Sequence, residues 1–132
     1  MRKLDETTFV FVRQLSVDEI DEAAASGIRL IVNNRPDGEE PGQPSSAELE
    51  AAARAAGLDY RHIPIAGAFP PEQVEAMAQA LEQGPVLAFC RSGTRSAFLW
   101  ALARASRGVP AAESVAAAAA AGYDLGPIRG LL

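Results

Sequence analysis

The sequence predicts an α/β fold, a three-layer sandwich in which helices cover both faces of a mostly parallel sheet of four or five strands. Short apolar runs alternate with helical runs along the chain, which is typical of parallel strands joined by helices. The run from Pro85 to Phe89 is apolar without alternation, as expected of a strand that is covered on both faces.

Length and composition limit the classes of protein to consider. The chain has 132 residues, which suits a single domain over residues 1–132, and 48% of them are hydrophobic, which indicates a globular protein. The net charge of −5, without a basic tract, argues against a nucleic-acid partner. A single cysteine forms no internal disulfide, and a reactive thiol survives best in a reducing cytosol, so we expect a cytoplasmic protein. No signal peptide or membrane-spanning stretch is visible, so no membrane partner is expected.

The first part of the chain predicts two strands, at residues 9–12 and 28–32, with a helix between them. Ser16 opens this helix and forms a capping box with Glu19. Gly27 ends it as a C-terminal cap.

A long polar loop over residues 33–44 follows the second strand, at the place where open α/β sheets bind their ligands. Ser45 and Glu48 form a second capping box and begin the next helix. A third strand is predicted over residues 58–65. Because Pro64 has no N–H to donate, this strand ends there or lies at an edge of the sheet.

The second half predicts a helix, the central strand, two further helices and a terminal segment that adds a short helix or packs across the body. The first helix begins at Pro70–Pro71. The central strand occupies residues 85–89, the two further helices occupy residues 96–107 and 111–121, and the terminal segment covers residues 123–132.

Cys90, the only cysteine, lies between the central strand and the helix that follows it. The N-terminus of a helix presents unpaired N–H groups and a positive dipole end, so a loop that wraps into it binds anions. Gly93 lets the backbone turn, and Arg95 offers a bidentate fork to a bound oxyanion. The same features favour the thiolate, so we expect Cys90 to be a nucleophile with a lowered pKa and Arg95 to act with it.

The remaining residues of this loop are expected to hold the anion, mostly through backbone N–H groups. They are Arg91, Ser92, Gly93, Thr94 and Ser96. The Arg91 side chain either faces the mouth of the loop or is simply solvated. The hydroxyls of Thr94 and Ser96 either bond the sulfur or cap the helix.

Residues 33–40 and 90–96 together resemble the phosphatase-like domain of bacterial beta-lactamase hydrolase-like proteins, and residues 122–125 fit as well. The resemblance covers nearly the whole chain. It implies the fold of protein tyrosine and dual-specificity phosphatases. The family has been described both as phosphatase-like and as a sulfur transferase, so the resemblance leaves the reaction open.

The Cys90 loop departs from the pattern of tyrosine phosphatases. Those enzymes show His-Cys, five residues and Arg, whereas here Phe89 precedes Cys90 and only four residues separate it from Arg95. The loop is similar to that of single-domain rhodaneses, and residues 66–71 lack the aspartate that related phosphatases use as an acid. We therefore expect a sulfurtransferase, in which Cys90 takes sulfane sulfur from thiosulfate or a persulfide and passes it to an acceptor thiol.

Two alternatives remain open. In the first, the protein is a phosphatase that hydrolyses a phosphoester through a phosphocysteine, with Asp37 as the proton donor, although an aspartate before Gly38 also fits an ordinary turn. In the second, the domain binds anions without catalysis. Each interpretation implies a small anionic partner and no cofactor, and one Cys with one His gives no recognisable metal-site spacing.

Three other residues receive structural interpretations. Arg35 is expected to pair with Glu39 or Glu40 rather than to reach the anion. His62 is expected to be a hydrogen-bonded structural residue, and Trp100 to lie in the core.

Overall fold

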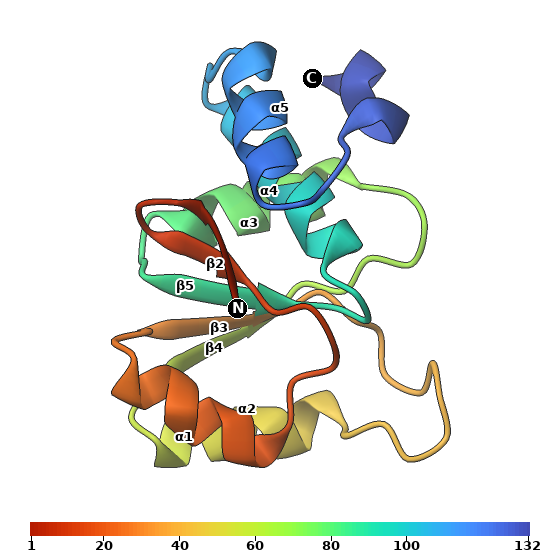
Figure 1. The fold of residues 1–132 in the computed structure, drawn as a ribbon. Coiled ribbons are helices and arrows are strands. Elements are labelled where there is room, and N and C mark those ends of the chain that lie inside the picture. The colour runs from red at the N-terminus through yellow and green to blue at the C-terminus, as the bar shows by residue number, and fades with distance from the viewer.

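The computed structural model describes residues 1–132 and contains one five-stranded sheet between two layers of helices (Figure 1). The strand order is β1-β2-β5-β3-β4; β1 is antiparallel to β2, and all other pairs are parallel. The predicted α/β class is therefore confirmed. The strands are β1 (Arg2–Asp5), β2 (Thr8–Val10), β3 (Leu30–Asn33), β4 (Asp59–His62) and β5 (Val86–Phe89). The helices are α1 (Val17–Ala25), α2 (Ser46–Ala55), α3 (Pro71–Leu81), α4 (Thr94–Ser106), α5 (Ala111–Ala120) and the 3-10 helix η1 (Gly126–Leu131).

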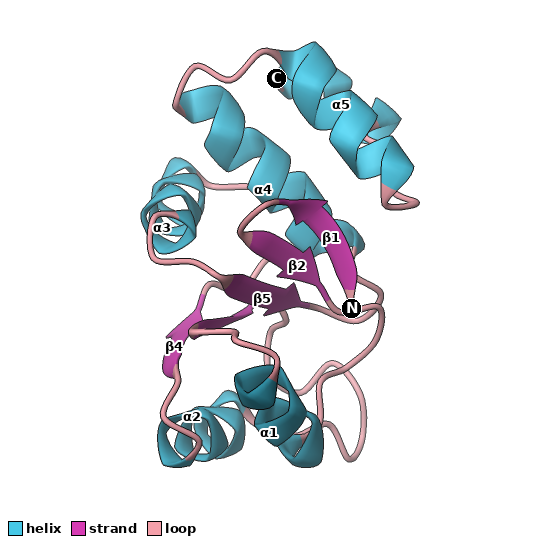
Figure 2. Cartoon of the chain, turned by 60° about the vertical axis from the view of Figure 1, so that its left-hand side comes forward, coloured by secondary structure: helices cyan, strands magenta, loops and turns pink.

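Different helices form the two layers (Figures 1 and 2). Helices α1 and α2 cover one face of the sheet, and α3, α4 and α5 cover the other. The central strand β5 serves both cores, because Val86 and Ala88 belong to the core under α4 whereas Leu87 and Phe89 belong to the core under α1 and α2. All four residues are buried, which explains why this strand shows no apolar alternation in the sequence.

Local signals placed most elements correctly. Ser16 and Glu19 form the expected capping box at α1. At α2, Ser45 caps Glu48 N–H as predicted, but the Glu48 carboxylate accepts from the Ser45 hydroxyl rather than from its backbone N–H. Strand β4 is shorter than the predicted residues 58–65, because it ends at His62, two residues before Pro64; it is an edge strand.

Strand β1 was not predicted. Arg2 and Lys3 are exposed and only Leu4 is buried, so the segment has no apolar pattern to reveal it. Charged residues are common on edge strands because they discourage pairing with other chains. None of the helices is both long and apolar enough to cross a membrane.

The loops that follow β3, β4 and β5 meet at one end of the sheet (Figure 1). The three strands are parallel, so their carboxyl ends all lie at this end. The loops comprise residues 34–45, 63–70 and 90–93, and the candidate site is built from them.

Candidate active site

Cys90 is the first residue after β5, and its side chain is almost completely buried, with 1% of its surface exposed. The loop curls back so that the Gly93 N–H donates a hydrogen bond to Cys90 Sγ at 3.1 Å. Gly93 is the N-cap of α4 and has φ +93°, a left-handed conformation that glycine adopts without strain. The sulfur therefore lies at the amino end of a helix, as the sequence predicts.

The environment of the sulfur favours the thiolate. Burial alone raises the pKa of the Cys90 thiol, but the backbone N–H groups of Ser96, Ser92 and Gly93 outweigh it. The net pKa of the thiol is lowered. A thiolate held by amides is the form required of a nucleophile.

Val10 and Tyr123, from distant parts of the sequence, pack against the loop at Gly93. A Cβ at Gly93 would lie 2.7 Å from Val10 Cγ1 and would collide with the Tyr123 hydroxyl. The Tyr123 hydroxyl also donates a hydrogen bond to the Ser92 carbonyl at 3.2 Å. The backbone of the loop is therefore closely packed where it turns.

A buried hydrogen-bond network joins the start of α4 to the loops that follow β3 and β4. Ser96 and Asn34 are both fully buried, and the Ser96 hydroxyl donates to Asn34 Oδ1 at 2.8 Å. The Asn34 amide donates in turn to the Ile63 carbonyl at 2.9 Å. The Thr94 hydroxyl instead pairs with the Ser92 hydroxyl at 3.2 Å. Neither of the two hydroxyls that the sequence offered to the sulfur is hydrogen-bonded to it, because that of Ser96 binds Asn34 and that of Thr94 pairs with Ser92.

Arg95 is held by a carboxylate that the sequence analysis did not assign to the site. Its two terminal nitrogens Nη1 and Nη2 each donate to one oxygen of Glu39 at 2.8 Å, and Nη1 also donates to the Ile65 carbonyl at 2.9 Å. These bonds lower the pKa of Glu39 to about 2, chiefly through Arg95. The pKa of Arg95 is raised, first by Glu39 and further by the nearby Cys90 charge.

The buried Arg35 joins this pair to a second one. Its Nε donates to Glu39 at 2.8 Å and its Nη2 donates to Glu40 at 3.0 Å, so the expected pairing is present with both carboxylates. Glu40 also pairs with Arg91 Nε at 2.9 Å. The Arg91 side chain is 72% exposed, as a solvated side chain would be.

Asp37 occupies a different place in the same loop. Its carboxylate accepts the Ser46 N–H at 2.8 Å, at the start of α2, and its charge faces Tyr60. None of its hydrogen bonds joins it to Cys90 or Arg95.

His62 and Trp100 have the structural roles that the sequence suggests. His62 Nε2 lies 2.9 Å from the Arg35 carbonyl, within hydrogen-bond distance. Trp100 is fully buried in the core, and its indole N–H donates to Asp5 at 3.0 Å.

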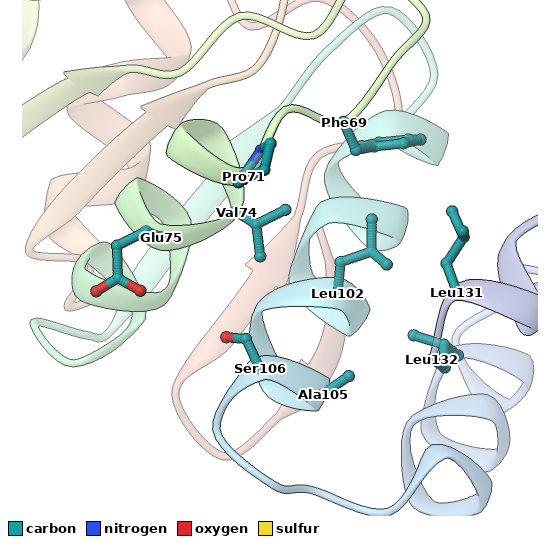
Figure 3. A pocket seen from close by; sticks show the side chains of 9 residues that line it. All are labelled: Phe69, Pro71, Val74, Glu75, Leu102, Ala105, Ser106, Leu131 and Leu132. Atoms are coloured by element: carbon teal, nitrogen blue, oxygen red, sulfur yellow. The ribbon is translucent and has the colours of Figure 1, made fainter.

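The surface cavities of the protein are lined by residues outside the Cys90 loop. An apolar groove of about 450 Å³ lies between α3, α4 and the last residues of the chain (Figure 3). Neither this groove nor the other cavities are lined by residues 90–96. Both arginines of the Cys90 loop are engaged by carboxylates, Arg95 by Glu39 and Arg91 by Glu40. No group of three or more His, Cys, Asp or Glu side chains is arranged to hold a metal ion.

Comparisons with known proteins agree with this geometry. Residues 1–109 match the family described as "Beta-lactamase hydrolase-like protein, phosphatase-like domain". The chain is 42% identical over 117 residues to the beta-lactamase hydrolase-like protein of Xylella fastidiosa, covering 86% of this chain and 27% of that protein. It thus spans about a quarter of the length of that relative.

Solved structures point the same way. A Neisseria meningitidis protein named as a candidate phosphatase superposes with a TM-score of 0.83 at 37% identity, over 98% of this chain and 93% of that one. Tk-PTP superposes with a TM-score of 0.73 over 98% of this chain and 90% of its own, at 23% identity, a likeness of fold alone.

Proposed function

Because the chain belongs to the family of phosphatase-like domains of beta-lactamase hydrolase-like proteins, we propose that it hydrolyses phosphoesters through a phosphocysteine on Cys90. The observation that carries the proposal is the buried sulfur with a lowered pKa, bonded by the Gly93 amide beside the Arg95 guanidinium. The substrate is a small anion that carries a phosphoryl group.

The reaction proceeds in two displacements. The Cys90 thiolate attacks phosphorus, an S–P bond forms, and the P–O bond to the leaving alcohol breaks. The loop N–H groups and Arg95 stabilise the charge on the equatorial oxygens in the transition state. Water then attacks the phosphocysteine, inorganic phosphate leaves, and the thiolate is restored.

The leaving oxygen needs a proton when the alcohol is a poor leaving group. Asp37 is the acid that the sequence suggests, and its contact with the Ser46 N–H equally supports a role at the start of α2. The Asp37→Asn variant separates these roles. A proton donor gives a loss of kcat that is much larger for an alkyl phosphate than for p-nitrophenyl phosphate. A capping residue gives equal, small losses for both substrates and a lower free energy of unfolding.

Sulfur transfer, which we expected from the sequence, finds no support in the related proteins. One observation still favours it as a second candidate: four residues rather than five separate Cys90 from Arg95. One residue fewer shortens the loop by roughly 3.3–3.6 Å of contour and gives a tighter cradle. Such a cradle suits a persulfide as well as a phosphoryl group.

A parallel assay distinguishes the two reactions. Wild type and Cys90→Ser are compared on p-nitrophenyl phosphate and, separately, on thiosulfate with cyanide. Release of p-nitrophenol that depends on Cys90, with a trapped adduct of one phosphoryl group, supports the proposal. Thiocyanate formation with a single added sulfur atom on Cys90, and no phosphatase turnover, refutes it in favour of sulfur transfer.

A further inference from the structure

The hydrogen bonds of Arg95 leave a defined part of its guanidinium free. The group has five N–H donors in one plane. Three are used: both on Nη1, by Glu39 and the Ile65 carbonyl, and one on Nη2, by Glu39. The Nε–H and the second Nη2–H have no oxygen partner in the protein, and the guanidinium interacts with the nearby Cys90 sulfur.

These two donors lie next to each other along one edge of the planar guanidinium group. They point in parallel and form a side-on fork that matches two oxygens of a tetrahedral oxyanion. Arg95 lies close enough to Cys90 for the two to interact. Glu39 occupies the adjacent, end-on fork formed by Nη1 and Nη2, so it leaves the side-on fork open and fixes the plane of the group.

Glu39 itself is held by Arg35. It lies in an exposed loop, and 30% of its side chain is accessible, so a free carboxylate at this position would sample several rotamers. The Arg35 side chain is only 3% exposed and is fixed from the other side by Gln14, which accepts its Nη1 at 2.9 Å. Its Nε binds Glu39 Oε1, the same oxygen that accepts Arg95 Nη2.

We propose that Arg35 and Glu39 are positioning residues that orient Arg95, so that its side-on fork, Nε–H and one Nη2–H, receives two oxygens of the substrate's oxyanion. This inference rests on the proposed function for the identity of the anion, a phosphoryl group. Arg35 and Glu39 act through Arg95 and do not touch the substrate. Without them, Arg95 has to be ordered each time an anion binds, which weakens binding by about tenfold.

Protection of Cys90 from alkylation tests the inference without turnover. Wild type, Glu39→Gln, Arg95→Lys and the double variant are alkylated with iodoacetamide at increasing concentrations of inorganic phosphate. Glutamine keeps the shape of Glu39 but places an N–H₂ against a guanidinium N–H, which breaks the bidentate pair. We expect about tenfold weaker phosphate protection in Glu39→Gln.

The double variant supplies the decisive comparison. If Glu39 acts through Arg95, then Glu39→Gln in the Arg95→Lys background costs less than twofold, because lysine has no fork to orient. Equal losses in both backgrounds overturn the inference. So does a wild-type protein that phosphate does not protect.

A matched control comes from the far side of the molecule. Glu75 also makes a bidentate pair, with Arg107 at 2.9 and 3.0 Å, away from the Cys90 loop. Glu75→Gln loses an equivalent ion pair and is expected to keep wild-type protection. Arg35→Lys, checked for folding by thermal unfolding, is expected to weaken protection in the same way as Glu39→Gln.

Turnover separates this inference from the proposed function. In an active enzyme, Glu39→Gln is expected to lower kcat/KM for p-nitrophenyl phosphate about tenfold or more. If no phosphoester is hydrolysed but protection follows the pattern above, the proposed function fails while the positioning role stands. If turnover is present and Glu39→Gln leaves it unchanged, the positioning role fails alone.

Discussion

Replacing Gly93 by alanine is expected to damage both the stability of the protein and the chemistry of its thiol. The residue has φ +93°, where an L side chain costs about 1–2 kcal/mol. The added methyl would also lie 2.7 Å from Val10 Cγ1 and against the Tyr123 hydroxyl, and such overpacking costs about 1–3 kcal/mol. Together these effects predict a loss of about 2–5 kcal/mol in the free energy of unfolding.

The same substitution moves the amide that bonds the sulfur. Gly93 N–H lies 3.1 Å from Cys90 Sγ, so a displaced backbone weakens the stabilisation of the thiolate. The pKa of Cys90 is therefore expected to rise in Gly93→Ala. The free energy of unfolding is measured by denaturant titration, and the thiol pKa by the rate of iodoacetamide alkylation as a function of pH.

Gly108 provides the control for backbone strain. It has φ +86°, and a Cβ there meets nothing within 4 Å, so Gly108→Ala carries the conformational cost without the collision. Adding Tyr123→Phe to Gly93→Ala removes one of the colliding atoms and should restore part of the stability. The reasoning is refuted if Gly93→Ala and Gly108→Ala lose equal stability and the thiol pKa is unchanged.

Three further outcomes are expected. Tyr123→Phe loses the hydrogen bond to the Ser92 carbonyl and should lower the free energy of unfolding by about 0.5–1.5 kcal/mol in denaturant titrations. Ser96→Ala removes the hydrogen bond to the buried Asn34 Oδ1 and should lower the free energy of unfolding by about 1–3 kcal/mol in the same titrations; an unchanged free energy of unfolding contradicts that role. The pKa of Glu39 is lowered from 4.5 to about 2, so the stability it contributes is complete above pH 4.5 and is lost as the pH falls towards 2. Equilibrium unfolding across this window should show a smaller decline for Glu39→Gln than for wild type.

The parts of the site that depend on local signals could be predicted from the sequence. An apolar run, a lone cysteine, a glycine and a helical run lie within about twenty residues, and together they place Cys90 at a helix N-terminus. The same holds for the Ser16 capping box, in which both partners lie within one helical turn.

The contacts between loops could not be predicted in the same way. Glu39 and Arg95 are 56 residues apart, and nothing in the local sequence of either selects the other. We expected Arg35 to pair with Glu39 because the two lie in one loop, but their common link to Arg95 depends on strand order. Because β3 and β5 are parallel neighbours, their following loops lie side by side. Tyr123 was hidden as well, because it lies 31 residues from Ser92 and reaches the loop from the turn after α5.

The role of Asp37 shows the limit of reading chemistry from residue type. A carboxylate in a ligand-binding loop fits a proton donor, yet a carboxylate also satisfies a free N–H at the start of a helix. The hydrogen bond to Ser46 N–H makes the second use visible only once the loop is folded.

The side chain of Asn34 offers a built-in spectroscopic reporter. Its amide group is sealed from solvent, with its carbonyl oxygen bonded by Ser96 at the start of α4 and its N–H₂ bonded to Ile63 after β4. Such protons exchange slowly with deuterium and give sharp, isolated resonances in NMR spectra. Titration with an oxyanion should shift these resonances, so occupancy of the cradle can be followed from inside the protein without a label on the thiol.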